Sequence, residues 1–321
     1  MVDTLRDARV VVTGGTGFIG SHLVRRLVAA GARPYLIVRA ESDFRRIDDV
    51  RPSCDIAVVN FIDDAIADRI RRIRPDVVFH LAGATTARGS DAGTGLVDRD
   101  FTRAFEINFT ATERLLLALA REAPDARVIR TGGLAEYGVG ALPFREDQRE
   151  EPASPYAASQ VAATHLGQAV HRQFGLAVTT LRPALTYGPA QSPTFFIPSL
   201  IAACLANRPF AVTSADHTRD FVYVDDVVDA LVAASLTRHV AGQVINVGSG
   251  RERRIGDIAA LIVRLTGARI ELSGDDRPRQ AGDLARLVCD ADRAKHVLGW
   301  TATTSIEDGL ERTIAWHRRQ S

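Results

Sequence analysis

Two hydrophobic patterns alternate along the first 182 residues of the chain. Short segments rich in apolar residues, typical of strands buried on both faces of a parallel sheet, occur at 9–13, 34–38, 55–60, 76–81, 127–131 and 177–182. Apolar residues at helical spacing lie between them, at 18–30, 62–73, 101–122 and 156–174. This alternation predicts an α/β fold, a doubly wound parallel sheet (Rossmann) with helices on both faces.

The regular alternation ends after Arg182. Proline and glycine then interrupt the chain, a helical pattern spans 197–206, and a strand pattern returns at 244–248. We therefore expect a smaller mixed α/β C-terminal lobe, with the substrate held in a cleft between the two parts. The predicted division assigns 1–183 plus 216–250 to the dinucleotide-binding domain and 184–215 plus 251–321 to the substrate-binding lobe.

Three glycines follow the first predicted strand at intervals of three residues. Gly14 allows the tight turn, Gly17 allows backbone N–H groups to approach a pyrophosphate, and Gly20 allows the next helix to pack closely on the strand. The positive end of that helix then faces the phosphates. Because a strand precedes the glycines and a helix follows them, the motif predicts a dinucleotide site.

The residue at the end of the second predicted strand bears on the choice of cofactor. In this fold an acidic residue there binds the ribose 2′-hydroxyl, whereas an arginine accommodates a 2′-phosphate. Here the strand ends in Val38-Arg39. The sequence therefore favours NADP(H) over NAD(H), and the alternative is that Arg39 is a solvated arginine at a strand end.

Tyr156 and Gln160 lie one turn apart on one face of a predicted helix. A tyrosine beside a nicotinamide can act as the general acid or base that moves a hydroxyl proton while the cofactor carries the hydride. His80 is a weaker candidate, because its neighbours in a predicted strand are apolar and favour a packed histidine over a general base. Asp225 and Asp226 precede a helical run and are expected to cap it.

Composition excludes several classes of protein. The net charge is +1 with both signs interspersed, so we expect no nucleic-acid or membrane partner. The three cysteines are far apart and odd in number, which argues against a disulfide framework and against a zinc site, so no metal is expected. No apolar segment is long enough to span a bilayer, and we expect a cytoplasmic protein.

Five segments together resemble the extended short-chain dehydrogenase/reductases, the NAD-dependent epimerase/dehydratase family, whose usual substrates are nucleotide-diphosphate sugars. They are Thr13-Gly14-Gly15-Thr16-Gly17-Phe18-Ile19-Gly20, His80-Leu81-Ala82-Gly83, Tyr156 to Gln160, Leu181-Arg182-Pro183 with Tyr187-Gly188-Pro189, and Arg219-Asp220-Phe221-Val222-Tyr223-Val224-Asp225-Asp226. The resemblance extends to Leu298-Gly299-Trp300. These motifs are specific for the family and not for one reaction.

The resemblance implies a role for each matching residue. Cofactor contacts are implied for Gly14, Thr16, Gly17, Phe18, Ile19 and Gly20 at the pyrophosphate, Asn60 and Phe61 at the adenine, Leu81, Ala82 and Gly83 at the nicotinamide ribose, Pro183 against the nicotinamide, and Tyr156 and Gln160 on the helix. Substrate contacts are implied for Thr85, Tyr187, Arg219 and Arg279, the two arginines clamping the diphosphate. Members commonly pair as dimers through a four-helix interface, here 101–122 and 156–174.

The chain departs from the family first at Gln160, where the family has lysine. Lysine hydrogen-bonds the ribose, and its charge favours the tyrosinate form of the neighbouring phenol. Glutamine keeps the hydrogen bond but brings no charge. We therefore expect Tyr156 to stay protonated, which suits a reductase that donates a proton.

The family's substrate-polarising Ser or Thr is the second departure. Counting back from Tyr137-Gly138 leads to Gly133, which has no hydroxyl, and counting back from Tyr156 leads to Thr131, which we prefer. The third departure is Leu185, where many members carry an asparagine that contacts the sugar nucleotide.

These observations favour an NADPH-dependent reductase of a 4-keto-6-deoxy sugar nucleotide, with Tyr156 as proton donor and Gln160 and Thr131 as its catalytic partners. The close alternative is a 4-epimerase or dehydratase that retains its NAD. A reading of another class is a catalytically impaired protein that binds cofactor or sugar nucleotide, because two of the three usual catalytic positions are altered, at Gly133 and Gln160.

Overall fold

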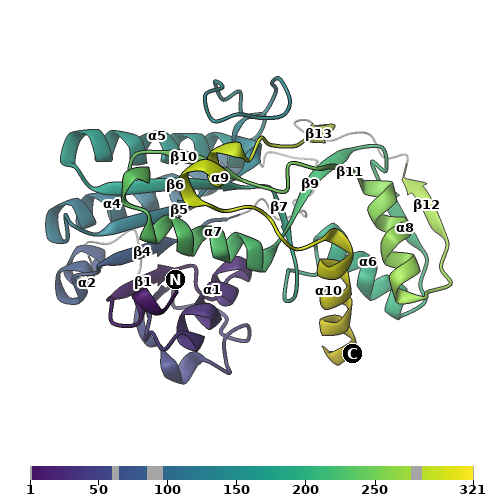
Figure 1. Ribbon diagram of the computed structural model, residues 1–321, viewed down its shortest axis with the longest axis horizontal. Helices are drawn as coiled ribbons and strands as arrows, with labels where there is room; N and C mark the ends of the chain where they lie inside the picture. The colour runs from purple at the N-terminus through teal and green to yellow at the C-terminus, as the bar shows by residue number, and fades with distance from the viewer. Residues whose placement is uncertain (1, 60–64, 85–96, 276–283, 321) are drawn as a thin grey trace.

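A seven-stranded parallel sheet forms the larger part of the computed structural model, which describes residues 2–59, 65–84, 97–275 and 284–320 (Figure 1). The strand order is β10-β6-β5-β4-β1-β2-β3. In that order the strands are β10 (Val244–Val247), β6 (Ala177–Pro183), β5 (Arg127–Thr131), β4 (Val77–His80), β1 (Val10–Thr13), β2 (Tyr35–Val38) and β3 (Asp55–Val58). The predicted doubly wound Rossmann fold is confirmed.

Helices cover both faces of this sheet because successive residues of each strand point to opposite sides. Val10 and Val12 belong to one core, and Val11 belongs to the other. The first core is closed by α1 (Phe18–Ala29) and α7 (Val224–Leu236), and the second by α2 (Ala65–Ile73), α4 (Ala111–Glu122) and α5 (Pro155–Phe174). The apolar segments in the sequence therefore reflect burial on both sides.

One predicted helix differs from the expectation. The pattern predicts a single helix over 101–122, but the structure has α3 (Val97–Phe105), a π-helical turn (Glu106–Thr110) and α4. Asn108 lies in this turn, where its side chain accepts from the Ala84 N–H at 2.9 Å and donates to the Ser159 hydroxyl at 2.9 Å. The irregular turn thus directs a buried amide toward the end of β4.

The smaller part of the molecule lies to the right in Figure 1. Its first sheet contains β11 (Glu252–Arg254), β9 (Thr218–Tyr223), β13 (Arg286–Leu287) and β7 (Leu185–Tyr187), and its second contains β8 (Phe210–Thr213) and β12 (Leu272–Asp275). Its helices are α6 (Phe196–Leu205), α8 (Ile255–Thr266) and α10 (Ile306–Gln320). A separate apolar core joins these elements, whereas α9 (Asp292–Leu298) packs against β10 and α7. The expected smaller mixed α/β lobe is present.

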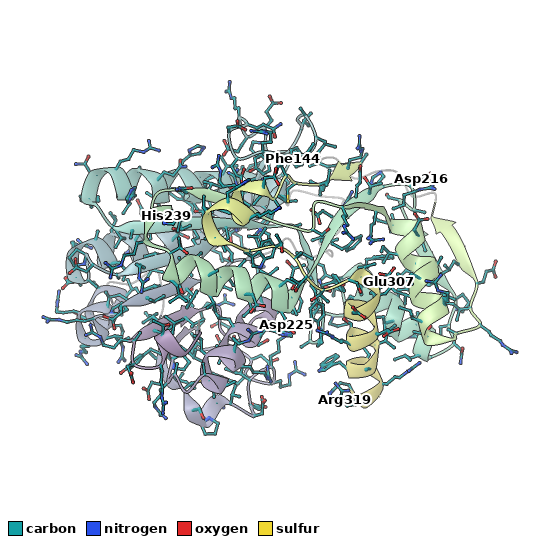
Figure 2. All side chains as sticks on the ribbon, viewed as in Figure 1. Phe144, Asp216, Asp225, His239, Glu307 and Arg319 are labelled. Carbon is teal, nitrogen blue, oxygen red and sulfur yellow. The ribbon has the colours of Figure 1, made fainter. Side chains whose placement is uncertain are left out.

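Two carboxylates at the start of α7 connect segments that are distant in the sequence. Asp225, labelled in Figure 2, pairs with His22 of α1 at 3.1 Å. Asp226 is buried and accepts hydrogen bonds from Thr303 and Thr304. The expectation that these residues cap their helix is wrong, because α7 begins after Tyr223 without a side-chain cap and both carboxylates have tertiary partners.

Replacing Gly20 by alanine should destabilise the fold. A Cβ at position 20 would lie 2.0 Å from the carbonyl oxygen of Gly14, so α1 would have to move away from the turn. We expect a loss of about 1–3 kcal/mol in the free energy of unfolding, measured by urea denaturation. Gly274→Ala is the matched control, because nothing lies within 4 Å of its added Cβ and its effect should stay within about 0.5 kcal/mol. Equal midpoints for the two variants would contradict this packing argument.

Candidate active site

The glycine turn after β1 lies directly against the end of β4. Gly14 has φ +70°, a conformation that favours glycine, and a Cβ there would come within 2.6 Å of the backbone of Leu81 and Ala82. The helix α1 begins after Gly17 and has no side-chain cap. N–H groups in its first turn are therefore available to an anion. This uncapped helix end beside a glycine turn fits the pyrophosphate of a dinucleotide.

His80 is fixed by two hydrogen bonds beneath this turn. Its Nδ1 lies 2.7 Å from Thr13 Oγ1, and its Nε2 lies 2.9 Å from Thr112 Oγ1. The Thr112 hydroxyl donates to the Asn108 carbonyl, so it accepts from Nε2–H, and Nδ1 accepts from Thr13. Burial lowers the pKa of His80 to about 3. The interpretation of a packed histidine is confirmed, with both ring nitrogens bonded.

Tyr156 stands in the first turn of α5, which begins after Ser154 with a side-chain cap to the Ala157 N–H. Its hydroxyl lies 3.7 Å from the position of a Cβ on Gly133, and that Cβ position is 3.9 Å from the Pro183 carbonyl. The structure therefore brings the predicted tyrosine together with the carboxyl ends of β5 and β6. Burial raises the pKa of Tyr156 to about 12, the Glu136 charge adds to the increase, and Arg130 opposes it.

The same distance bears on the two candidates for the family's hydroxyl position. Gly133 faces the Tyr156 hydroxyl, whereas Thr131 is the half-buried last residue of β5, opposite Leu181 in the sheet. The geometry favours the count from Tyr137, and therefore Gly133, over our preferred Thr131. At that position no side-chain hydroxyl is available to the substrate.

Gln160 is buried one turn after Tyr156, and its amide is held by Arg130 of β5. The Arg130 Nη2 donates to Gln160 Oε1 and, at 3.3 Å, to the Gln160 carbonyl. The amide Nε2 faces Gly83, 3.6 Å from the position of a Cβ there. The structure therefore places Gln160 between Arg130 and the segment implied to line the nicotinamide ribose.

Glu136 is the centre of a buried network next to Tyr156. Its Oε1 accepts from the Gly133 N–H at 3.0 Å. Its Oε2 accepts from the Thr164 hydroxyl at 2.7 Å and from Arg182 Nε and Nη2 at 3.0 and 2.7 Å. Arg182 also pairs with Glu150 at 2.7 Å. The carboxylate thus fixes the backbone of the residue that faces the Tyr156 hydroxyl.

Sequence reasoning missed Asn108, Arg130 and Glu136. Arg130 follows Val128 and Ile129 in a predicted buried strand, so it carried a signal as a charged residue within expected core. Glu136 stands in the short segment between β5 and Tyr137, and the structure shows that it too is buried. Asn108 carried a weaker signal, a polar residue on a predicted helix. The hydrogen-bond partners that define the role of each residue are distant in the sequence.

Arg39 lies just beyond β2 and is exposed. Its guanidinium pairs with Glu41 at 3.1 Å, and its N–H donates to the Ser42 hydroxyl at 3.0 Å. Exposed pairs of this kind contribute little to stability, so the guanidinium is free to exchange partners. The arginine remains compatible with a 2′-phosphate, and Glu41 is a carboxylate that sequence reasoning did not consider.

The predicted substrate residues have mixed outcomes. Arg219 is half-buried and donates to the carbonyl oxygens of Thr218 and Ala285 at 2.8 and 3.2 Å. Tyr187 is 1% exposed and packs against Phe221 and Tyr223, so the prediction that it borders the substrate does not fit its position in the core of the smaller lobe. The other two predicted substrate residues, Thr85 and Arg279, lie outside the described residues, as do Asn60 and Phe61, which were predicted to contact the adenine of the cofactor.

The described chain also bears on the expectations for cysteines, metal ligands and membrane-spanning helices. All three cysteines are buried and free. Within residues 2–59, 65–84, 97–275 and 284–320, no cluster of His, Cys, Asp and Glu is arranged to hold a metal. Nor does any helix in these ranges have the length and apolar character needed to cross a membrane.

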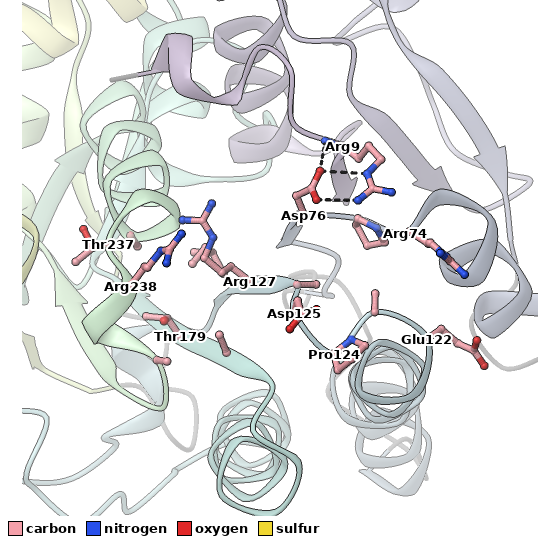
Figure 3. A pocket seen from close by; sticks show the side chains of 17 residues that line it. Arg9, Arg74, Asp76, Glu122, Pro124, Asp125, Arg127, Thr179, Thr237 and Arg238 are labelled. Atoms are coloured by element: carbon pink, nitrogen blue, oxygen red, sulfur yellow. Dashed lines mark hydrogen bonds and ion pairs between the residues drawn. The ribbon is translucent and has the colours of Figure 1, made fainter.

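A cavity of about 730 Å³ lies at the opposite edge of the main sheet (Figure 3). It is lined by residues at the amino ends of strands, including Arg9, Asp76 and Arg127, and Figure 3 shows the side chains of Arg127 and Arg238 next to each other on one side of it. None of the predicted site residues lines it. Ligands of this fold bind at the carboxyl ends of the strands, so this cavity is not the candidate active site.

The sequence profile of the NAD dependent epimerase/dehydratase family matches residues 10–248. A UDP-glucose 4-epimerase of Mycolicibacterium smegmatis is 33% identical over 324 residues, covering 98% of this chain and 99% of the relative. The chain belongs to the NAD dependent epimerase/dehydratase family. This membership confirms the predicted enzyme class, the extended short-chain dehydrogenase/reductases.

Two further members of the family illustrate its range. The crystal structure of UDP-glucuronic acid 4-epimerase from Bacillus cereus, in complex with UDP-glucuronic acid and NAD, has a TM-score of 0.86 and 26% identity, covering 98% of this chain and 100% of that chain. A trifunctional UDP-glucose 4,6-dehydratase/UDP-4-keto-6-deoxy-D-glucose 3,5-epimerase/UDP-4-keto-L-rhamnose-reductase of Arabidopsis thaliana is 29% identical over 98% of this chain. The chain spans 48% of the length of that plant relative.

Tyr156 should titrate with a pKa of about 12, above the ordinary value of 10. The difference in tyrosinate absorbance between the native protein and Tyr156→Phe isolates this one group. Because the pKa is higher in the folded than in the unfolded chain, the unfolded chain loses the proton first, and the contribution of Tyr156 to stability should fall as the pH rises from about 10 toward 12. A titration midpoint at or below 10 would contradict the assignment.

Proposed function

We propose that this enzyme is an NADP(H)-dependent reductase of a nucleotide-diphosphate sugar, specifically of a 4-keto-6-deoxy sugar nucleotide, with Tyr156 as the proton donor. The observation that carries the proposal is the position of the Tyr156 hydroxyl, in a buried site next to Gly133 and the Glu136 carboxylate, where the phenol is held protonated. Its hydroxyl lies beside the carboxyl ends of β5 and β6, and burial and Glu136 raise its pKa to about 12.

Reduction of a ketone needs one hydride and one proton. A bound nicotinamide cofactor would supply the hydride, and the Tyr156 hydroxyl would donate the proton to the carbonyl oxygen, giving an alcohol and a tyrosinate that water reprotonates. Epimerisation and dehydration through a 4-keto sugar start in the opposite direction, because a base must first remove a hydroxyl proton. A phenol with a pKa of about 12 is a poor base at neutral pH but arrives protonated.

The carboxylates near Tyr156 support the same direction of reaction. Dehydration needs a further acid or base to release water. Within the described part of the chain, Glu136 is the one carboxylate whose charge acts on Tyr156. Both of its oxygens accept hydrogen bonds within the buried network, from Gly133, Thr164 and Arg182. Because both oxygens already accept hydrogen bonds, we favour a structural role for Glu136 over a role as catalytic acid or base.

The choice of NADP(H) rests on Arg39. A 2′-phosphate offers the guanidinium a doubly charged partner in place of the exposed Glu41 carboxylate. The Bacillus cereus relative binds NAD, which keeps NAD(H) as the alternative cofactor. On the substrate side we place the diphosphate at Arg219, whose guanidinium is anchored to two backbone carbonyls.

The second candidate is a 4-epimerase or dehydratase that keeps its NAD bound. The UDP-glucose 4-epimerase of Mycolicibacterium smegmatis favours it, whereas the name of the trifunctional plant relative includes both a dehydratase and a reductase. Such an enzyme would purify with oxidised cofactor that does not exchange. For either activity we expect a homodimer in which α4 and α5 of two chains form a four-helix interface.

Turnover should be assayed with NADPH and a thymidine- or uridine-diphosphate 4-keto-6-deoxy sugar. We expect stoichiometric NADPH oxidation, and Tyr156→Phe should lower kcat by about 10²–10⁴-fold because the proton donor is lost. Leu185→Ala serves as a control outside the proton pathway and should keep a measurable rate. No NADPH oxidation, together with interconversion of C4 epimers by protein that retains NAD, would overturn the reductase proposal.

Arg39→Ala should weaken NADPH binding by about 10- to 100-fold, the range expected for losing a hydrogen-bonded charged contact. NADH binding should be unchanged by this substitution, because NADH lacks the 2′-phosphate. Calorimetry on protein stripped of cofactor measures both affinities. Equal affinity for NADPH before and after the substitution would remove Arg39 from the proposal, and Glu41→Ala would then test the carboxylate as a ligand for the 2′-hydroxyl of NADH.

A further inference from the structure

Arg130 is a fully buried cation in the middle of the main sheet, 1% exposed. Its side chain reaches from β5 to α5, where Nη1 donates to the Thr164 hydroxyl at 2.9 Å and Nη2 donates to the carbonyl and the side-chain oxygen of Gln160. Burying a guanidinium is unfavourable unless hydrogen bonds and an opposite charge compensate it. We therefore expect a buried arginine in a central strand to have a role that an apolar side chain could not perform.

The contact between Arg130 and Gln160 decides which way the amide points. A guanidinium has donors and no acceptor, so only the oxygen of the Gln160 amide can face it. The NH₂ group must then point the other way, and it faces Gly83 at the end of β4. Gln160 alone could adopt either orientation, because the two ends of an amide have the same shape. With Arg130 in place, the donor end faces the segment assigned to the nicotinamide ribose.

We propose that Arg130 is a positioning residue that, together with Gln160, replaces the lysine of the family's helix motif. Gln160 supplies the donor toward the ribose, and Arg130 supplies the positive charge near the Tyr156 hydroxyl and holds the amide in its productive orientation. One function is thus divided between α5 and β5. This inference rests on the proposed function for Tyr156 and Gln160, and it names a residue that the family motif does not contain.

The charges around Tyr156 explain how Tyr156 stays a proton donor when Gln160 and Arg130 share the roles of the family's lysine. Arg130 approaches from β5 and Glu136 from the turn that follows it, and Gln160 on the same helix carries no charge. Arg182 of β6 pairs with Glu136 and with Glu150. Two cations and two carboxylates therefore balance in this network. A lysine at 160 would add a third cation next to the Arg130 guanidinium, with no carboxylate to match it.

The test is a cycle of three variants, Arg130→Met, Gln160→Lys and the double variant. Arg130→Met should weaken cofactor binding by about tenfold, because the Gln160 amide is free to turn. Gln160→Lys should also weaken it by about tenfold, because two cations are forced together without solvent. The double variant keeps the same number of cations in the network as the native protein, and should bind cofactor more tightly than either single variant.

The pH dependence of turnover supplies a readout that a merely structural role would not move. In the double variant the ammonium lies on the same helix as Tyr156, so the alkaline limb of the pH–rate profile should move to lower pH than in the native enzyme. Arg127→Met is the matched control, because Arg127 is the half-buried arginine at the other end of β5 and lines the distant cavity. Its cofactor affinity and pH profile should equal those of the native protein.

Additive effects on cofactor affinity, or a Gln160→Lys single variant at least as tight and active as the native enzyme, would overturn the proposal. Affinity is measured by calorimetry without sugar, using whichever of NADPH or NAD the native protein binds, and thermal unfolding confirms that each variant is folded. If the reductase assay fails while the cycle shows coupling, the proposed reaction is wrong and the pairing of Arg130 with Gln160 stands. If Arg130→Met does not fold, the double variant is compared with Gln160→Lys alone: tighter cofactor binding by the double variant supports the proposal, and equal or weaker binding overturns it.

Discussion

The buried carboxylate of Glu136 is the constraint on which the active site depends. It accepts from the Gly133 N–H, from Thr164 on α5 and from Arg182 on β6, so one side chain fixes three elements relative to each other. Its charge also acts on Tyr156 and partly balances Arg130. Removing water from these groups makes each interaction strong and each missing partner unfavourable. The position and the protonation state of Tyr156 therefore follow from one network.

Most of the main sheet could be predicted from the sequence. The strands β1, β2, β4, β5, β6 and β10 are short segments rich in apolar residues and are buried on both faces, and their composition is visible in the sequence. The glycine turn was predictable for a similar reason, because Gly14 needs a positive φ and Gly20 needs contact with Gly14. The π-helical turn around Asn108 was not, because the hydrogen bonds of the Asn108 side chain go to Ala84 and Ser159, which are distant from it in the sequence.

The site could be predicted only in part, since sequence spacing does not measure distance between elements. Two counts gave Gly133 and Thr131 for one position, and only the separation of Gly133 from the Tyr156 hydroxyl distinguishes them. Tyr187 stands in a recognised motif, yet its ring packs in the core of the smaller lobe. A motif indicates which residues recur together, but the direction of each side chain depends on the packing of neighbouring strands and helices.

Gln160 shows why a changed motif residue is weak evidence for lost activity. Read alone, the substitution of lysine removes a charge that the chemistry of Tyr156 depends on. In the structure a guanidinium from the neighbouring strand contacts the substituting amide, so a cation is still present beside the helix. Arg130 in turn donates to the Thr164 hydroxyl, which donates to Glu136, and the charge of that carboxylate compensates the buried guanidinium. The charge near Tyr156 therefore depends on Arg130, Glu136, Thr164 and Gln160 together. It cannot be inferred from the residue at position 160 alone.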